Sequence, residues 1–140
     1  MAIPPYLTLE IVTPDRSILH ERVDEVEIPG ADGYFGVLPG HTPLLASLQV
    51  GVLWYRKGGE KSYLSIAFGF AEVLPDRVTI LAQICERAEE IDINRAEAEK
   101  KQAEEQIARA RANVDMERAR ASLMKALVRL QAASRARTRS

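Results

Sequence analysis

The sequence has one cysteine, Cys85, and two histidines among its 140 residues. A lone cysteine excludes an intrachain disulfide and any metal site built from several cysteines, and it is typical of a reducing compartment. No window holds the roughly 18 to 20 apolar residues that a membrane-spanning helix needs. The first residues also lack the basic stretch and apolar run of a secretory signal. We therefore expect a soluble, intracellular protein.

Side chains that carry catalysis are scarce as well. With two histidines and one cysteine, a zinc site would need carboxylates at irregular spacing, so we predict no metal site. No serine lies in a Gly-x-Ser-x-Gly motif. The run Gly30-x-x-Gly33-x-x-Gly36 lacks the Gly-Lys-Ser/Thr ending of a phosphate loop and precedes no predicted helix, so we expect these glycines to serve turns. Because no nucleophile, base and oxyanion hole can be assembled, we interpret the chain as a non-enzyme without catalytic residues.

Glycine, proline and aromatic residues are confined to the first part of the chain, where the last of each kind are Gly69, Pro75 and Phe70. The formal net charge of −1 conceals a second division. Residues 1–90 carry 7 basic and 13 acidic side chains, whereas residues 91–140 carry 12 basic and 7 acidic ones. We therefore predict two domains, at residues 1–88 and 89–140.

The first segment shows the period-two pattern of half-buried strands. Over residues 6–13, Leu7, Leu9 and Ile11 fall on one face, and Thr8 and Glu10 on the other. Short connectors rich in glycine, proline and charge predict hairpin turns. Similar patterns predict strands at 23–28 (ended by the Pro-Gly pair that follows), 51–56, 63–68, 70–74 and 78–82. Strands with no helix between them predict a small antiparallel β-sandwich or barrel.

The second segment shows helical periodicity, and 12 of the last 50 residues are alanine. Asp92 is a suitable N-cap for a first helix, and Asp115 for a second. Apolar residues recur in steps of three and four from Ile93 to Val114 and again from Met116 to Ala133, as in a heptad seam. We predict an antiparallel two-helix hairpin with a basic tail, and hence an α+β fold class with the β-sandwich first. Such an alanine-rich hairpin is expected to be marginal alone and able to leave its docking surface.

The basic helical segment also raises the question of nucleic-acid binding. Its cations are interleaved with acidic residues, and it has no aromatic side chain on which a base could stack. We therefore predict no nucleic-acid partner and favour an acidic protein surface.

Three stretches of the chain are distinctive when taken together. They are the segment from Gly33 to Leu45, with its Leu-Pro-Gly-His-x-Pro-Leu run, the pair of stretches 69–73 and 78–82, and residues 91–96. In this order they resemble the loop-and-turn signature, the last sandwich strands and the opening of the helical region in the ε subunit family of F-type ATP synthases. The resemblance implies a non-catalytic rotor subunit of the central stalk that couples proton flow to ATP synthesis. It also implies association with the membrane only through the complex, as a peripheral protein at the cytoplasmic face of the bacterial inner membrane, although composition leaves a plastid origin open.

The resemblance further implies partners and contact residues. The sandwich would contact the γ subunit and the c-subunit ring near Asp32, Tyr34 and His41. Tyr34 stands where an acidic residue is common, and His41 has an alternative as a turn residue bonded to backbone. The hairpin would extend towards the α and β subunits and block ATP hydrolysis. The cations expected to contact their acidic surface are Arg118, Arg120, Lys125 and Arg129.

Some members of this family bind ATP as a regulatory ligand in the folded hairpin, and no cofactor is otherwise required. The matching positions here are Glu86, Asp92, Arg95 and Arg129, together with Ile91 and Ala96. Gln102 and Lys125 replace two further arginines, and lysine is a poorer bidentate partner for phosphate. Two alternatives therefore stay open beside the rotor subunit: an ATP-sensing module, and a free-standing adaptor with a helical arm.

Overall fold

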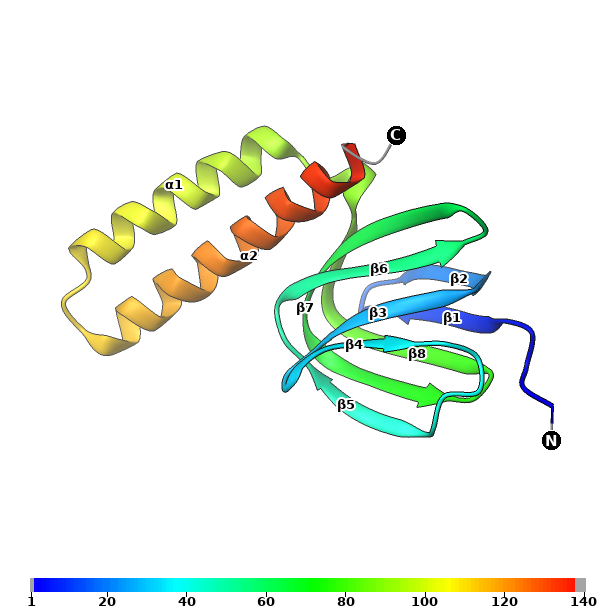
Figure 1. Ribbon diagram of the computed structural model, residues 1–140. Helices are drawn as coiled ribbons and strands as arrows, with labels where there is room; N and C mark the ends of the chain where they lie inside the picture. Colours follow the sequence, from blue (N-terminus) through cyan, green and yellow to red (C-terminus); the bar gives the residue numbers. More distant parts are fainter. Residues whose placement is uncertain (1, 138–140) are drawn as a thin grey trace.

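The computed structural model describes residues 2–137 as a β-sandwich followed by a pair of long helices (Figure 1). The predicted fold class is confirmed. The strands are β1 (Leu7–Val12), β2 (Ser17–Val23), β3 (Glu25–Gly30), β4 (Gly33–Val37), β5 (Leu44–Leu48), β6 (Gly51–Lys57), β7 (Glu60–Leu74) and β8 (Arg77–Arg87). A short 3-10 helix, η1 (Ala88–Glu90), leads into α1 (Ile93–Arg109) and α2 (Asn113–Arg137). The predicted boundary between residues 88 and 89 falls within η1.

The sandwich core is built by the alternation expected from the sequence. Leu7, Leu9 and Ile11 are fully buried along one face of β1. Buried residues of the other strands complete one continuous apolar cluster. Since each buried aliphatic side chain contributes about 1.5 to 3 kcal/mol, this cluster gives the sandwich a core of its own.

The strands follow the order β2-β1-β8-β7-β5-β3-β4, and β6 bridges β3 and β7. The pairings among the described residues are antiparallel except one: β1 and β8 run parallel, with Leu9 opposite Val78 and Ile11 opposite Ile80. The first and last strands of the sandwich are therefore neighbours. Local sequence patterns carry no signal for this pair, because its partners lie about seventy residues apart.

The prediction of two separate strands at residues 63–68 and 70–74 is wrong. Both stretches belong to the single long strand β7. The strand bends at Phe68 and Gly69, where φ is 61° and 127°. Before this bend β7 pairs with β6, and after it β7 pairs with β5. The bend thus carries one strand from one layer of the sandwich into the other.

Two further strand predictions need correction. Val23 ends β2, and the strand predicted at 23–28 is β3, which begins at Glu25 and continues through the Pro-Gly pair expected to end it. The pair belongs to the strand because Gly30 lies opposite Gly33 where β3 turns into β4. The signature segment that follows contains β4 and the start of β5 rather than only loops and turns.

The two helices form the predicted antiparallel hairpin. Asp92 caps α1 as expected, since its carboxylate accepts a hydrogen bond from the Arg95 backbone N–H at 3.0 Å. The predicted cap at Asp115 is wrong: α2 begins at Asn113, and the Met116 N–H already donates to the Ala112 carbonyl. The buried alanines of the interhelical seam are Ala96, Ala103, Ala119, Ala126 and Ala133. At the other end α2 continues into the predicted basic tail, of which residues 138–140 lie outside the described residues.

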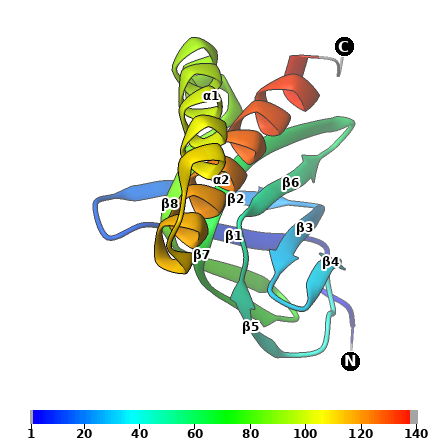
Figure 2. The ribbon, with the colours of Figure 1, turned by 90° about the vertical axis from the view of Figure 1, so that its left-hand side faces the viewer.

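Of the two helices, α2 packs on the sandwich, against β6, β7 and η1 (Figure 2). The residues of this contact form a second apolar cluster, hereafter the docking cluster: Val52, Tyr63, Ala88, Ile91, Val128, Ala132 and Ala133. The end of the hairpin that carries the α1–α2 connection projects away from the sheet (Figure 1). The hairpin is therefore held mainly at the end nearest the sandwich.

The single cysteine is part of the sandwich core. Burial of Cys85 in β8 raises the pKa of its thiol to about 12. The thiol is therefore protonated at neutral pH, and a protonated buried thiol is a poor nucleophile.

Candidate functional site

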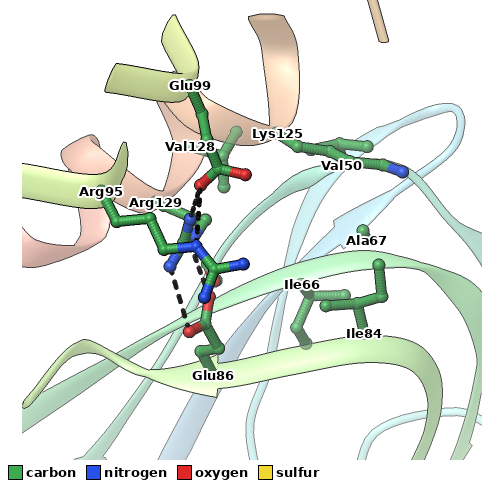
Figure 3. Close-up of a pocket in the computed structure, with 11 residues that line it drawn as sticks. Val50, Ile66, Ala67, Ile84, Glu86, Arg95, Glu99, Lys125, Val128 and Arg129 are labelled. Carbon is green, nitrogen blue, oxygen red and sulfur yellow. Dashed lines mark hydrogen bonds and ion pairs between the residues drawn. The ribbon is translucent and has the colours of Figure 1, made fainter. Parts of the chain in front are cut away.

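A pocket of about 340 Å³ lies between the hairpin and the outer face of β7 and β8 (Figure 3). Its apolar side is formed by Val50, Ile66, Ala67, Ile84 and Val128, with Ser65 beside them. Charged residues of β8, α1 and α2 form the other side: Glu86, Arg95, Glu99, Lys125 and Arg129. An apolar floor beside convergent charged groups is the usual composition of a site for a small polar ligand.

Arg129 is the centre of this charged side. Its Nε and Nη2 donate to the two carboxylate oxygens of Glu86 at 2.6 and 3.3 Å, and its Nη1 donates to Glu99 Oε1 at 2.5 Å. Glu99 also lies 3.9 Å from Nε of Arg95, one helical turn earlier on α1. A single guanidinium thus connects the sandwich, α1 and α2.

Burial on its own would lower the pKa of Arg129, since it disfavours the charged form. Hydrogen bonds and attraction from Glu86, and then from Glu99, outweigh that effect and raise the pKa above its ordinary value. Only 17% of the arginine side chain is exposed. The cation is therefore permanently charged and depends on both carboxylates for compensation.

Three of the four residues matched to a regulatory ATP site come together in this pocket, namely Glu86, Arg95 and Arg129. Asp92 does not line it, because its carboxylate is engaged as the cap of α1. Gln102 lies in an adjoining interhelical cavity of about 320 Å³, which Lys125 and Arg129 also line. Sequence reasoning missed Glu99, although its position four residues after Arg95 is a spacing that places both on one helix face.

The residues predicted to contact the c ring lie around β4. Asp32 is exposed in the turn between β3 and β4. Tyr34 is half exposed, yet its hydroxyl accepts a hydrogen bond from the Val52 N–H at 3.0 Å. Its ring covers Gly51 so closely that an added Cβ there would lie 2.3 Å from the hydroxyl oxygen. Tyr34 therefore ties β4 to β6.

His41 follows β4 in the loop towards β5. Its ring Nδ1 lies 2.6 Å from the carbonyl oxygen of Thr42. Since a carbonyl can only accept, this nitrogen carries the ring proton. The contact matches the alternative of a turn residue bonded to backbone.

The four arm cations do not form one exposed face in this conformation. Arg118 and Arg120 are exposed on α2. Lys125 is half-buried with its Nζ 5.8 Å from the ring centre of Phe68, and Arg129 is held by its two carboxylates. Lys125 and Arg129 could meet a partner surface only after α2 leaves the sandwich. Arg120 lies on the opposite side of α2 from Arg118, because two residues span about 200° of helical turn.

Within residues 2–137, no cluster of three or more histidine, cysteine or acidic side chains is arranged to hold a metal ion. Over the same residues, neither helix is long and apolar enough to cross a membrane.

Comparison with known proteins decides the family. The model of the ATP synthase delta/epsilon chain β-sandwich domain matches residues 6–88, and that of the delta/epsilon long α-helix domain matches residues 89–134. The chain belongs to the ATP synthase epsilon chain family. It is 48% identical over 125 residues to the ATP synthase epsilon chain of Nitratidesulfovibrio vulgaris (strain DP4), covering 89% of this chain and 93% of that one. It is 46% identical over 133 residues to the epsilon chain of Solibacter usitatus, covering 95% and 99%.

Solved structures agree with this membership of the epsilon family. A chain of the Euglena gracilis mitochondrial ATP synthase, in an OSCP/F1/c-ring assembly, superposes with a TM-score of 0.84 at 27% identity, over 96% of this chain and 84% of that one. A chain of the Tetrahymena thermophila central stalk and c ring shares the fold, with a TM-score of 0.65 at 13% identity over 91% and 96%. The family resemblance of the sequence is confirmed.

Proposed function

We propose that this epsilon-family chain is a non-catalytic rotor subunit of the central stalk, which helps couple proton transport to ATP synthesis and inhibits ATP hydrolysis through its helical hairpin. The observation that carries the proposal is the separation of two apolar clusters. The sandwich core contains only strand residues, whereas the hairpin is attached through the docking cluster. Release of the hairpin therefore leaves the sandwich core intact.

Charge supports a role for the released arm. The segment 91–140 carries 12 basic residues against 7 acidic ones. Exposed Arg118 and Arg120 add to the cations that become available when α2 undocks. Such a helix is suited to acidic surfaces of the α and β subunits. An arm bound there would hinder the rotation that ATP hydrolysis drives.

The part of the sandwich around β4 and β5 is suited to the γ subunit and the c ring. Asp32 is exposed there, and a cavity of about 600 Å³ lies between residues 30–35 and residues 44–47. Exposed Leu44 and Leu45 border this cavity. With the c ring as its neighbour, the chain would reside at the cytoplasmic face of the bacterial inner membrane, attached only through the complex.

Truncation after Ile91 tests the inhibitory role. In the reconstituted ATP synthase we expect the truncated chain to raise ATP hydrolysis by about tenfold, the factor that corresponds to about 1.4 kcal/mol of arm binding. The physical reason is that the sandwich keeps its core while the blocking segment is gone. The assay is steady-state ATP hydrolysis at matched enzyme concentration.

The control is co-sedimentation of the truncated chain with the complex, which shows that a change in hydrolysis does not come from loss of the chain from the assembly. Unchanged hydrolysis in a fully assembled complex would contradict an inhibitory arm. The sandwich would then serve in coupling alone.

The charged pocket favours a second candidate, regulation by ATP. Its apolar side could receive an adenine ring, and Arg95, Lys125 and Arg129 could pair with phosphate oxygens. A nucleotide held between β8 and both helices would stabilise the docked hairpin by its differential affinity for that state. In this proposal ATP is a regulatory ligand and not a substrate.

Gln102→Arg tests this candidate. The new guanidinium would face the cavity that adjoins Arg129, so we expect ATP to bind about tenfold more tightly through one added charge-assisted contact. Isothermal titration calorimetry of the full chain measures the affinity. Gln131→Arg, which adds the same charge at an exposed position of α2, is the matched control. Equal affinities of the two variants would refute the pocket as the site.

A further inference from the structure

The charged pocket already contains anions that belong to the chain. Both groups that accept from Arg129 are carboxylates, Glu86 from β8 and Glu99 from α1 (Figure 3). A ligand phosphate approaching this guanidinium would meet Glu99 first on the side of the helices. The charge of the Arg129 guanidinium is thus compensated in the docked state without any added molecule.

We propose that Glu99 is a built-in anion, which joins α1 to Arg129 of α2 within the docked hairpin and keeps ligand phosphates away from that guanidinium. The inference rests on the proposed nucleotide candidate and adds to it the residue that determines whether an anionic ligand can enter. Docking of the hairpin on the sandwich would then not require a bound nucleotide in this chain.

The geometry of Arg129 supports this assignment. Three of the five N–H donors of this guanidinium, one each on Nε, Nη1 and Nη2, are directed at carboxylate oxygens. The Nη1 contact to Glu99 is a charge-assisted hydrogen bond between a guanidinium and a carboxylate. A phosphate oxygen can take this position only by displacing Glu99.

Glu99 also lowers the positive potential that would attract a phosphate chain. It lies 3.9 Å from Arg95 Nε, so it partly compensates a second cation of the pocket. At the same time 47% of its side chain is exposed. Because it borders water, Glu99 can be exchanged for another anion, which a fully buried partner could not be.

Glu99→Gln tests the proposal, with Glu97→Gln as the matched control. Glu97 is an exposed α1 residue outside the pocket, and its substitution removes the same charge. Hydrogen–deuterium exchange of the full-length chain, read by mass spectrometry over residues 124–133, reports how often α2 undocks. We expect exchange about tenfold faster in Glu99→Gln, the factor for losing one charge-assisted hydrogen bond, and unchanged in Glu97→Gln. Added ATP should slow exchange more strongly in Glu99→Gln than in the unmodified chain.

Two outcomes would overturn the role of Glu99: exchange in Glu99→Gln equal to that in Glu97→Gln, or protection by ATP as strong in the unmodified chain as in Glu99→Gln. If Glu99→Gln opens the hairpin and ATP protects no variant, the role of Glu99 stands and the nucleotide candidate fails. Circular dichroism checks that the total helix content is the same in each variant. Arg129→Gln removes the contacts to both Glu86 and Glu99, so it should accelerate exchange at least as much as Glu99→Gln.

Discussion

Gly69→Ala is expected to destabilise the sandwich by about 4 kcal/mol, or to prevent its folding. An added Cβ would lie 1.9 Å from the carbonyl oxygen of Leu81, and φ at this position is +127°. The obstacle is backbone of the neighbouring strand, so no side-chain rotation can relieve it. β7 and β8 would have to separate where β7 crosses between the layers.

Urea unfolding followed by circular dichroism measures this effect. Gly36→Ala is the matched control, because it also replaces a strand glycine but places Cβ where no atom lies within 4 Å. We expect it to change the free energy of unfolding by less than about 1 kcal/mol. A Gly69→Ala chain that unfolds at the urea concentration of the unmodified chain would show that the bend does not need glycine.

Ala132→Glu is expected to release the hairpin while the sandwich stays folded. Ala132 is fully buried in the docking cluster. An unpaired carboxylate there would cost about 3 kcal/mol or more. Undocking of α2 exposes that carboxylate to water at the loss of a small apolar contact, so the chain avoids the cost by opening rather than by unfolding.

Trp54, the only tryptophan, reports this change because it packs partly buried against the docking cluster. Its emission should shift to longer wavelength in Ala132→Glu and stay unchanged in Gln131→Glu, which places the same charge on the neighbouring exposed position. In the assembled synthase, Ala132→Glu should lower ATP hydrolysis, opposite to truncation after Ile91, because the arm is released but not removed. Identical emission from the two variants would contradict the docked arrangement.

Features set by neighbouring residues were predictable from the sequence. The alternation of Leu7, Leu9 and Ile11 gave the buried face of β1, and Asp92 gave the start of α1. Features that depend on distant partners were not predictable. The parallel pairing of β1 with β8 joins the two ends of the sandwich, and β7 was interpreted as two strands because Gly69 resembles a turn.

The same distinction holds for the candidate site. Family-matched positions correctly indicated that Glu86, Arg95 and Arg129 come together. Glu99 was not among the predicted positions, because its contact with Arg129 exists only after the two helices have folded against each other. Val128 and Ala132 were also missed, since they lie outside the interhelical seam and are buried only against the sandwich.

The strand order has a consequence for how the chain is built at the ribosome. β8 is the last strand to be synthesised, yet it lies between β1 and β7. The edge of β1 that pairs with β8 therefore stays unpaired until Arg77–Arg87 has emerged from the ribosome. No shorter nascent chain can complete the sheet. The residues of α2 that dock on the sandwich emerge later still. Order of synthesis alone makes the arm the last part to be added, onto a platform that is already closed.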